Sequence, residues 1–354
     1  NYMSYWARSG TYAPNTQEET YQLTTNFQAQ IWTAVFDNNF DYEVMRISAE
    51  KAGADFYAGI ARIMKAHNFG ILVDIYNNVP YSQALKGGAN VTPAYDKGAD
   101  IYKDLLRQID TGIALIKNAN VSDIGPNKSI LTDDVMFGEL SAAYNNTPYT
   151  QQELWAKFGN TLKLRLLVHL MNGGVEANPS GTLGTPGSVV PGFDIAGEIA
   201  AIEAEGSGYL DFNAEVQPGY AADKRNPFYS SYVQDEAGTA TANSVYYKAN
   251  KWGIEYYDYD GDARINRFYV AGSQGLRGVE YGAPSDNANA AATLAGIGPG
   301  VTRGITAPAW IMSAAEGYFL QAEAMHRGFM SGDAKAILAN GIRSSFVMLG
   351  LSAA

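Results

Sequence analysis

Helical spacing of apolar residues is the feature that most limits what this chain can fold into. Apolar side chains recur every three or four residues over 17–40 and 42–69, and again from Ile101 to Ile116, after Pro93. The pattern returns over 151–171, 194–205, 309–329 and 333–349. This periodicity predicts amphipathic α-helices, and the short breaks between several of them favour antiparallel helix pairs.

The tract 206–308 separates the two helical blocks and has a different character. Gly, Pro, Asn, Ser and Tyr dominate it, and helical periodicity disappears. We therefore predict an all-α fold of tetratricopeptide-like helix pairs, with long irregular loop insertions that contain a few short strands. The helical scaffold would occupy about 16–205 and 309–350, the loop-rich insertion about 206–308, and all of 1–354 would form a single domain.

Charge and composition exclude several classes of function. Asp and Glu outnumber Lys and Arg by 36 to 25, a net charge of −11, which argues against a nucleic-acid partner. Cysteine is absent, so the chain has no thiolate metal site and no catalytic thiol. The longest apolar stretches, such as 164–171, are too short to span a membrane.

Motifs for catalysis and cofactor binding are also missing. His67, His169 and His326 are isolated, and neither a nucleophile elbow nor a phosphate-binding loop is present. We therefore predict no catalytic residues and no organic cofactor. A pair of loop carboxylates acting on glycans stays open as an alternative, because such a pair is defined by its separation in space.

One acidic run has the spacing of a calcium loop. Alternate carboxylates at Asp258, Asp260 and Asp262 can point oxygens at one cation. Ala263 and Tyr269 stand where an EF-hand requires Gly and Glu. A solvated turn is the favoured interpretation, with calcium as the alternative.

Aromatic residues in the expected loops indicate a binding surface. The chain has 24 tyrosines but only 17% charged residues. Aromatic faces stack on sugar rings, and amides bond to hydroxyls; the same surface also suits peptides. We predict ligand contacts near residues 5–12, 77–81 and 246–259, specifically at Trp6, Tyr12, Asn78, Tyr81, Trp252 and Tyr257. The structural alternative is that these rings hold the loops against the helices.

Several strings, in a fixed order along the chain, resemble the SusD/RagB family. Residues 69–84 are similar to its D-x-Y-x-x-x-P-Y-x-x-A segment, and residues 155–166 to its W-x-K-F-A-N-T-L-K-L-R-L helix. Residues 134–138 resemble D-x-x-Y/F-G, residues 225–229 N-P-x-Y, and residues 262–264 D-P-R. Residues 315–324, 332–334 and 341–346 resemble its last helix pair. Gly159, Ala263 and Gly317 depart from the usual pattern.

The resemblance implies a function that the residues alone do not establish. It implies a non-enzymatic lipoprotein on the surface of the outer membrane of a Bacteroidetes-type bacterium. Such a protein captures glycans, or in some relatives peptides, and delivers them to a SusC-like TonB-dependent transporter. Family members begin with a lipid-bearing cysteine and continue beyond the last helix pair, so we expect this chain to be truncated at both ends. Membrane attachment would then come only from an N-terminal lipid that this chain does not contain. A scaffold that holds another protein through its helix pairs is a further alternative.

Overall fold

The computed structural model describes residues 3–122, 124–171 and 190–353, which form two compact units. One unit, called here the helical unit, comprises Gln28–Val216 and Trp310–Ile342. The other, called the mixed unit, comprises Asn1–Phe27, Gln217–Ala309 and Arg343–Ala354. The predicted insertion at 206–308 therefore does not stand alone, because both ends of the chain pack with it. The single-domain description of 1–354 stays a prediction.

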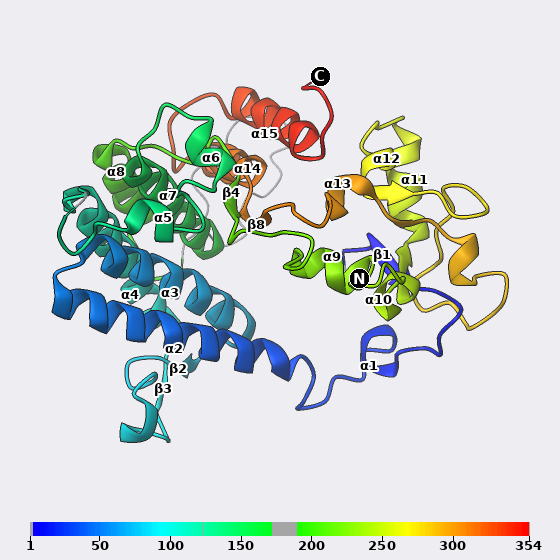
Figure 1. Ribbon diagram of the computed structural model, residues 1–354, viewed down its shortest axis with the longest axis horizontal. Coiled ribbons are helices and arrows are strands. Elements are labelled where there is room, and N and C mark those ends of the chain that lie inside the picture. Colours follow the sequence, from blue (N-terminus) through cyan, green and yellow to red (C-terminus); the bar gives the residue numbers. More distant parts are fainter. Residues whose placement is uncertain (1–2, 123, 172–189, 354) are drawn as a thin grey trace. The chain divides into compact units, whose positions relative to one another are not determined.

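Long antiparallel helices build the helical unit (Figure 1). The central helix α3 packs between α2 and α4, and α7 packs against α4, α8 and α14. Its helices are α2 (Ala29–Ala52), α3 (Asp55–Tyr76), α4 (Gly98–Asn118), α5 (Ile130–Asp133), α6 (Ala142–Asn145), α7 (Gln151–Leu170), α8 (Ile195–Glu205), α14 (Ala314–His326) and the first part of α15 (Ala334–Met348). Its strands pair as β2 (Val79–Pro80) with β3 (Tyr95–Asp96) and β4 (Ala214–Val216) with β8 (Ala309–Met312), and Gly87–Ala89 forms a 3-10 turn.

Short elements make up the mixed unit. They are β1 (Trp6–Arg8), α1 (Thr16–Glu19), α9 (Pro227–Tyr232), α10 (Ala242–Tyr246), β5 (Tyr247–Ala249), α11 (Lys251–Tyr259), α12 (Ile265–Phe268), β6 (Tyr269–Val270), β7 (Gly296–Ile297), α13 (Pro299–Thr302) and a 3-10 turn at Ala291–Thr293. Strand β1 pairs antiparallel with β5, and β6 with β7. The all-α prediction with a few short strands is thus confirmed.

Helix α2 differs most from its prediction. A break was expected between Phe40 and Tyr42, but α2 runs without interruption through these residues. Asn39 is buried within it, and both Phe36 and Tyr42 pack against the main core. The helix ends instead at Gly53, whose positive φ of 68° allows its N–H to bond back to the carbonyls of Ala49 and Glu50.

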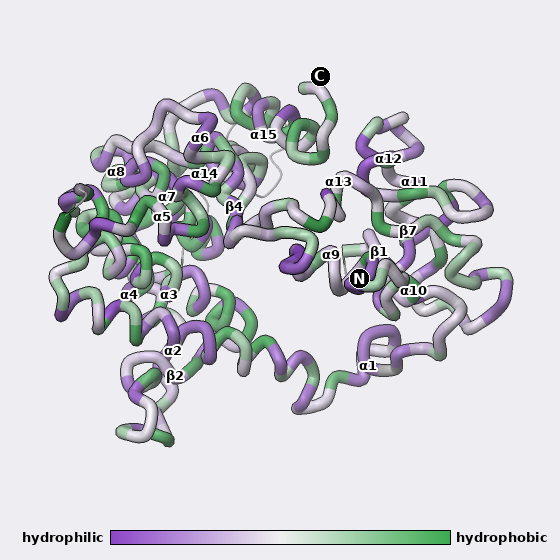
Figure 2. Tube along the Cα trace, in the orientation of Figure 1, coloured by the Kyte–Doolittle hydropathy of each residue, from purple (hydrophilic) through white to green (hydrophobic). Residues whose placement is uncertain are grey.

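Helix α7 occupies the centre of the helical unit. Apolar residues colour much of α3 and α7 in Figure 2, and Leu154, Phe158 and Leu162 are buried in one continuous core. Lys163 is also fully buried, and its ammonium lies 2.8 Å from Asp110 of α4 and 2.6 Å from Glu198 of α8. One basic side chain thereby joins α7 to two neighbouring helices.

A capping box fixes the start of α7. The Thr150 hydroxyl accepts from the Glu153 N–H at 3.3 Å, and the Glu153 carboxylate accepts from the Thr150 N–H at 2.7 Å.

None of the described helices combines the length and the apolar character needed to cross a bilayer.

Candidate functional site

Strand pairing in the mixed unit brings two of the three predicted ligand segments together. Trp6, Ala7 and Arg8 of β1 stand opposite Ala249, Lys248 and Tyr247 of β5. The segments 5–12 and 246–259 are therefore neighbours although they are far apart in the sequence. The third segment, 77–81, belongs to the helical unit.

The segment after β5 is a helix, whereas the sequence analysis placed its aromatic residues in or beside loops. Asn250 caps α11 by accepting from the Trp252 N–H at 2.9 Å. Gly253, Ile254 and Tyr257 form its buried face. Residues four and seven positions beyond Trp252 share the opposite face, as the helical repeat requires.

Three aromatic side chains on this outer face form what we call the α11 aromatic stripe: Trp252, Tyr256 and Tyr259. They are 53%, 56% and 90% exposed. The rings of Trp252 and Tyr256 are stacked, with centroids 5.2 Å apart and planes at 21°. Their outer edges and faces remain available to a flat apolar ligand surface. The site prediction included only Trp252 of these three, although their spacing at i, i+4 and i+7 was visible in the sequence.

Two other predicted ligand residues hold the unit together. Tyr257 is only 4% exposed, and its ring stacks on Phe268 at a centroid distance of 5.1 Å. Trp6 meets the buried Tyr269 edge to face at 5.3 Å. These contacts match the structural alternative, in which the rings anchor loops and short helices.

Tyr12 joins a second aromatic group, called here the tyrosine row. Its members are linked in order through ring contacts of 4.8–5.6 Å: Tyr12, Tyr246, Tyr247, Tyr232 and Phe228. Burial raises the pKa of both Tyr246 and Tyr247. All four tyrosines are half-buried, so the row offers less free ring surface than the α11 aromatic stripe.

Acidic residues surround the α11 aromatic stripe. Glu255, Asp258 and Asp260 are exposed. The Lys251 ammonium lies 2.9 Å from Glu280 and 4.0 Å from Glu255, and the hydrogen bond with Glu280 raises the pKa of Lys251. A cavity of about 610 Å³ adjoins this side of α11 and is lined by residues including Ile254, Arg277 and Asn289.

The calcium interpretation of this region gains no support from the geometry. Asp262 is bound by Arg264, whose Nε lies 3.0 Å from each carboxylate oxygen. Across the described ranges, which omit 1–2, 123, 172–189 and 354, no three His, Asp or Glu side chains are grouped as a metal would need. Asp258 lies in the last turn of α11 and Asp260 is the residue that follows the helix, and both are exposed.

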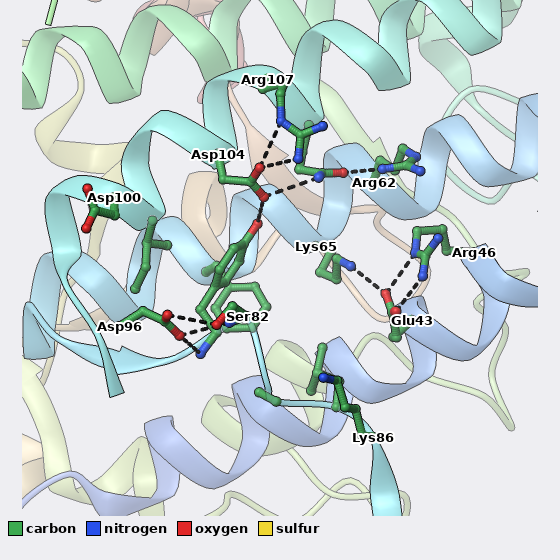
Figure 3. A pocket seen from close by; sticks show the side chains of 16 residues that line it. Glu43, Arg46, Arg62, Lys65, Ser82, Lys86, Asp96, Asp100, Asp104 and Arg107 are labelled. Atoms are coloured by element: carbon green, nitrogen blue, oxygen red, sulfur yellow. Dashed lines mark hydrogen bonds and ion pairs between the residues drawn. The ribbon is translucent and has the colours of Figure 1, made fainter. Parts of the chain in front are cut away.

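The predicted residue Tyr81 lines a different cavity, also of about 610 Å³, in the helical unit. We call it the α2–α4 pocket, because α2, α3 and α4 supply most of its walls, together with the chain after β2 (Figure 3). Figure 3 shows two groups of paired charges in the pocket, one around Glu43 and one around Asp104, whereas Lys86 and Asp100 are drawn without a contact. Glu43 accepts from Arg46 and Lys65, and Asp104 accepts from Arg107, Gln108 and the Tyr81 hydroxyl.

The pKa shifts in this pocket reflect the same pairing. Burial alone would raise the pKa of Glu43, but hydrogen bonds from Arg46 and Lys65 outweigh it and lower the value to about 2. Burial lowers the pKa of Lys65, and burial together with Asp104 raises that of Tyr81. A neutral ligand would have to compete with these ion pairs, so the pocket is less suited to a hydroxyl-rich ligand than the α11 aromatic stripe.

Asn78 has a structural contact of its own. It is exposed, and its side-chain oxygen accepts from the N–H of Gly98, at 3.0 Å, where α4 begins. This bond satisfies one of the free N–H groups at the helix N-terminus.

Of the six predicted ligand residues, four lie in the mixed unit and two in the helical unit. Only Trp252 among them belongs to the α11 aromatic stripe.

Several solved structures of SusD homologues share the fold of this chain. A SusD homologue from Bacteroides fragilis matches with a TM-score of 0.70 and 19% identity, covering 98% of this chain and 68% of that one. A SusD-like protein from Bacteroides thetaiotaomicron matches at 0.70 and 19%, covering 99% and 65%. A chitin-binding SusD homologue from Flavobacterium johnsoniae matches at 0.68 and 20%, covering 99% and 64%. The chain thus spans about two thirds of the length of these structures.

Sequence comparison identifies the family. No curated protein matches the chain. The SusD-like family model described as "Starch-binding associating with outer membrane" matches residues 1–349, nearly the whole chain. The chain therefore belongs to the SusD/RagB family.

Proposed function

We propose that this chain captures glycans at the bacterial surface through the α11 aromatic stripe. The observation that carries the proposal is the stacked, half-exposed pair Trp252 and Tyr256, with Tyr259 one turn further along the helix. Exposed aromatic rings on one face are costly to leave in water, and covering them with the apolar faces of sugar rings would be favourable.

The rest of the pathway is inferred from the family. The chain would be non-enzymatic, tethered to the outer membrane by an N-terminal lipid, and would deliver its glycan to a SusC-like TonB-dependent transporter. The family description, which names starch binding and the outer membrane, supports this proposal. Two solved structures that share the fold at 20% identity are described as chitin-binding.

A binding titration tests the placement of the site. Wild-type protein, Trp252→Ala and Tyr95→Ala are titrated with neutral oligosaccharides by calorimetry. Tyr95 is a matched control, because it is a 65% exposed aromatic residue in the helical unit. Truncating a central aromatic contact costs about 2 kcal/mol, so Trp252→Ala should weaken binding about 30-fold. Equal affinities for the two variants would refute the placement.

Two further measurements separate the alternatives. Release of shortened sugars by the purified protein would favour the glycan-processing enzyme, and tighter binding of peptides than of sugars would favour the peptide-binding alternative. Co-purification of the lipidated full-length protein with a TonB-dependent β-barrel, with glycan uptake dependent on both, would support delivery to a transporter.

A further inference from the structure

Negative charges outnumber positive charges around the α11 aromatic stripe, and this excess narrows the class of glycan that the stripe would bind. Five carboxylates lie on or beside α11, at Glu255, Asp258, Asp260, Asp262 and Glu280, against three basic groups, at Lys251, Arg264 and Arg277. Within the described part of the chain, Asp258 and Asp260 have no basic partner. Glu280 already neutralises Lys251, at 2.9 Å. The surface of the stripe therefore carries an excess of negative charge.

Helical geometry places these carboxylates next to the rings. Residues three and four positions apart on a helix are neighbours, with Cβ atoms about 5–6 Å apart. Glu255 lies three positions after Trp252 and four before Tyr259, and Asp260 follows Tyr256 by four. Each ring of the stripe therefore has a carboxylate within about one Debye length, roughly 8 Å at physiological ionic strength.

We propose that the α11 aromatic stripe selects glycans that carry protonated amino groups, such as glucosamine oligomers, over neutral ones and most strongly over those that carry carboxylates. The proposal rests on the proposed glycan-binding function. Two effects act together: an ammonium group is attracted to the faces of Trp and Tyr, and the neighbouring carboxylates attract it further. A uronic acid placed on the same rings would be repelled by Glu255, Asp258 and Asp260.

The test compares two probes that differ only in N-acetylation. Tetramers of glucosamine and of N-acetylglucosamine are titrated at pH 6 into the wild-type protein, at 50 mM and at 500 mM NaCl. We expect the free-amine tetramer to bind about tenfold more tightly at low salt, a difference of about 1.4 kcal/mol. The preference should shrink at high salt, because screening weakens exposed charges.

Charge variants show whether these carboxylates cause the preference. In the double variant Glu255→Gln/Asp258→Asn, the affinity for the glucosamine tetramer should approach the affinity for the N-acetylglucosamine tetramer. The control Asp37→Asn/Asp41→Asn removes the same number of exposed carboxylates from α2 and should keep the wild-type ratio. Equal affinities of the wild type for the two tetramers would overturn the proposal. An equal loss of preference in both double variants would also overturn it, since a general attraction between an acidic protein and a polycation would then explain the preference.

Trp252→Ala separates the failure of this inference from the failure of the proposed function. If Trp252→Ala weakens binding of the neutral tetramer but the wild type shows no preference for the amine, only the selectivity is wrong. If Trp252→Ala changes neither affinity, the stripe is not the glycan site and both proposals fail. Absence of any binding by the wild-type protein would also overturn both.

Discussion

The crossing of α3 and α4 gives a sharp prediction about packing, because two glycines meet there. An ideal Cβ built on Gly59 would lie 2.5 Å from Ile116 Cγ1 and 2.6 Å from the carbonyl oxygen of Gly112. The oxygen belongs to the backbone of a packed helix and cannot rotate away. Gly59→Ala should therefore push the two helices apart.

The magnitude follows from two opposing effects. Replacing Gly by Ala inside a helix stabilises it by about 1 kcal/mol. Overpacking a tight core costs about 1–3 kcal/mol, and contact with the backbone favours the upper end. The expected net destabilisation is about 1–2 kcal/mol, a decrease in melting temperature of about 2–8 °C for a protein unit of this size.

A second glycine on the same helix supplies the control. A Cβ on Gly70 would meet only Leu166 Cδ2, at 3.1 Å, which is the end of a flexible side chain. Gly70→Ala should thus leave stability within about 0.5 kcal/mol of the wild type, because the propensity gain offsets a small adjustment. Thermal unfolding followed by far-UV circular dichroism measures both variants. Equal melting temperatures for Gly59→Ala and Gly70→Ala would refute the close crossing of α3 and α4.

Two other predictions concern the helical unit. Thr150→Ala should destabilise the chain by about 1 kcal/mol, because it removes the side-chain hydrogen bond that caps α7. The control Ser129→Ala should leave the stability unchanged, because Ser129 precedes α5 without a side-chain cap. Equal urea midpoints for the two variants would contradict this prediction. The pKa of Glu43 falls from an ordinary 4.5 to about 2 on folding, so its contribution to stability is complete above pH 4.5 and is lost as the pH falls toward 2. The difference in urea midpoint between the wild type and Glu43→Gln should shrink over that interval, and a constant difference would count against the ion pairs with Arg46 and Lys65.

Local patterns were enough to predict most of the helical unit. The stripe of Ile101, Leu105, Ile109, Ile113 and Ile116 is buried along α4, and Asp194 caps α8 as its position suggested. The end of α2 was missed because the sequence analysis divided the periodic pattern between Phe40 and Tyr42, whereas the helix continues to Ala52. Packing of Phe36 and Tyr42 against the core overrode this division of the pattern.

The candidate site was harder to predict, because it depends on contacts between distant segments. Nothing local indicates that β1 pairs with β5, about 240 residues later. A tract rich in Gly and Asn concealed α11, whose nine residues are too few for a strong periodic signal. Without that helix, Tyr256 and Tyr257 were indistinguishable, yet one is exposed and the other is buried beside Phe268.

The most direct measurement is a crystal structure of the chain with the glucosamine tetramer that the titrations employ. We expect sugar rings to lie on Trp252 and Tyr256, with amino groups directed toward Glu255, Asp258 or Asp260. An oligosaccharide bound over the tyrosine row or inside the α2–α4 pocket, with the α11 aromatic stripe left bare, would contradict the proposed site.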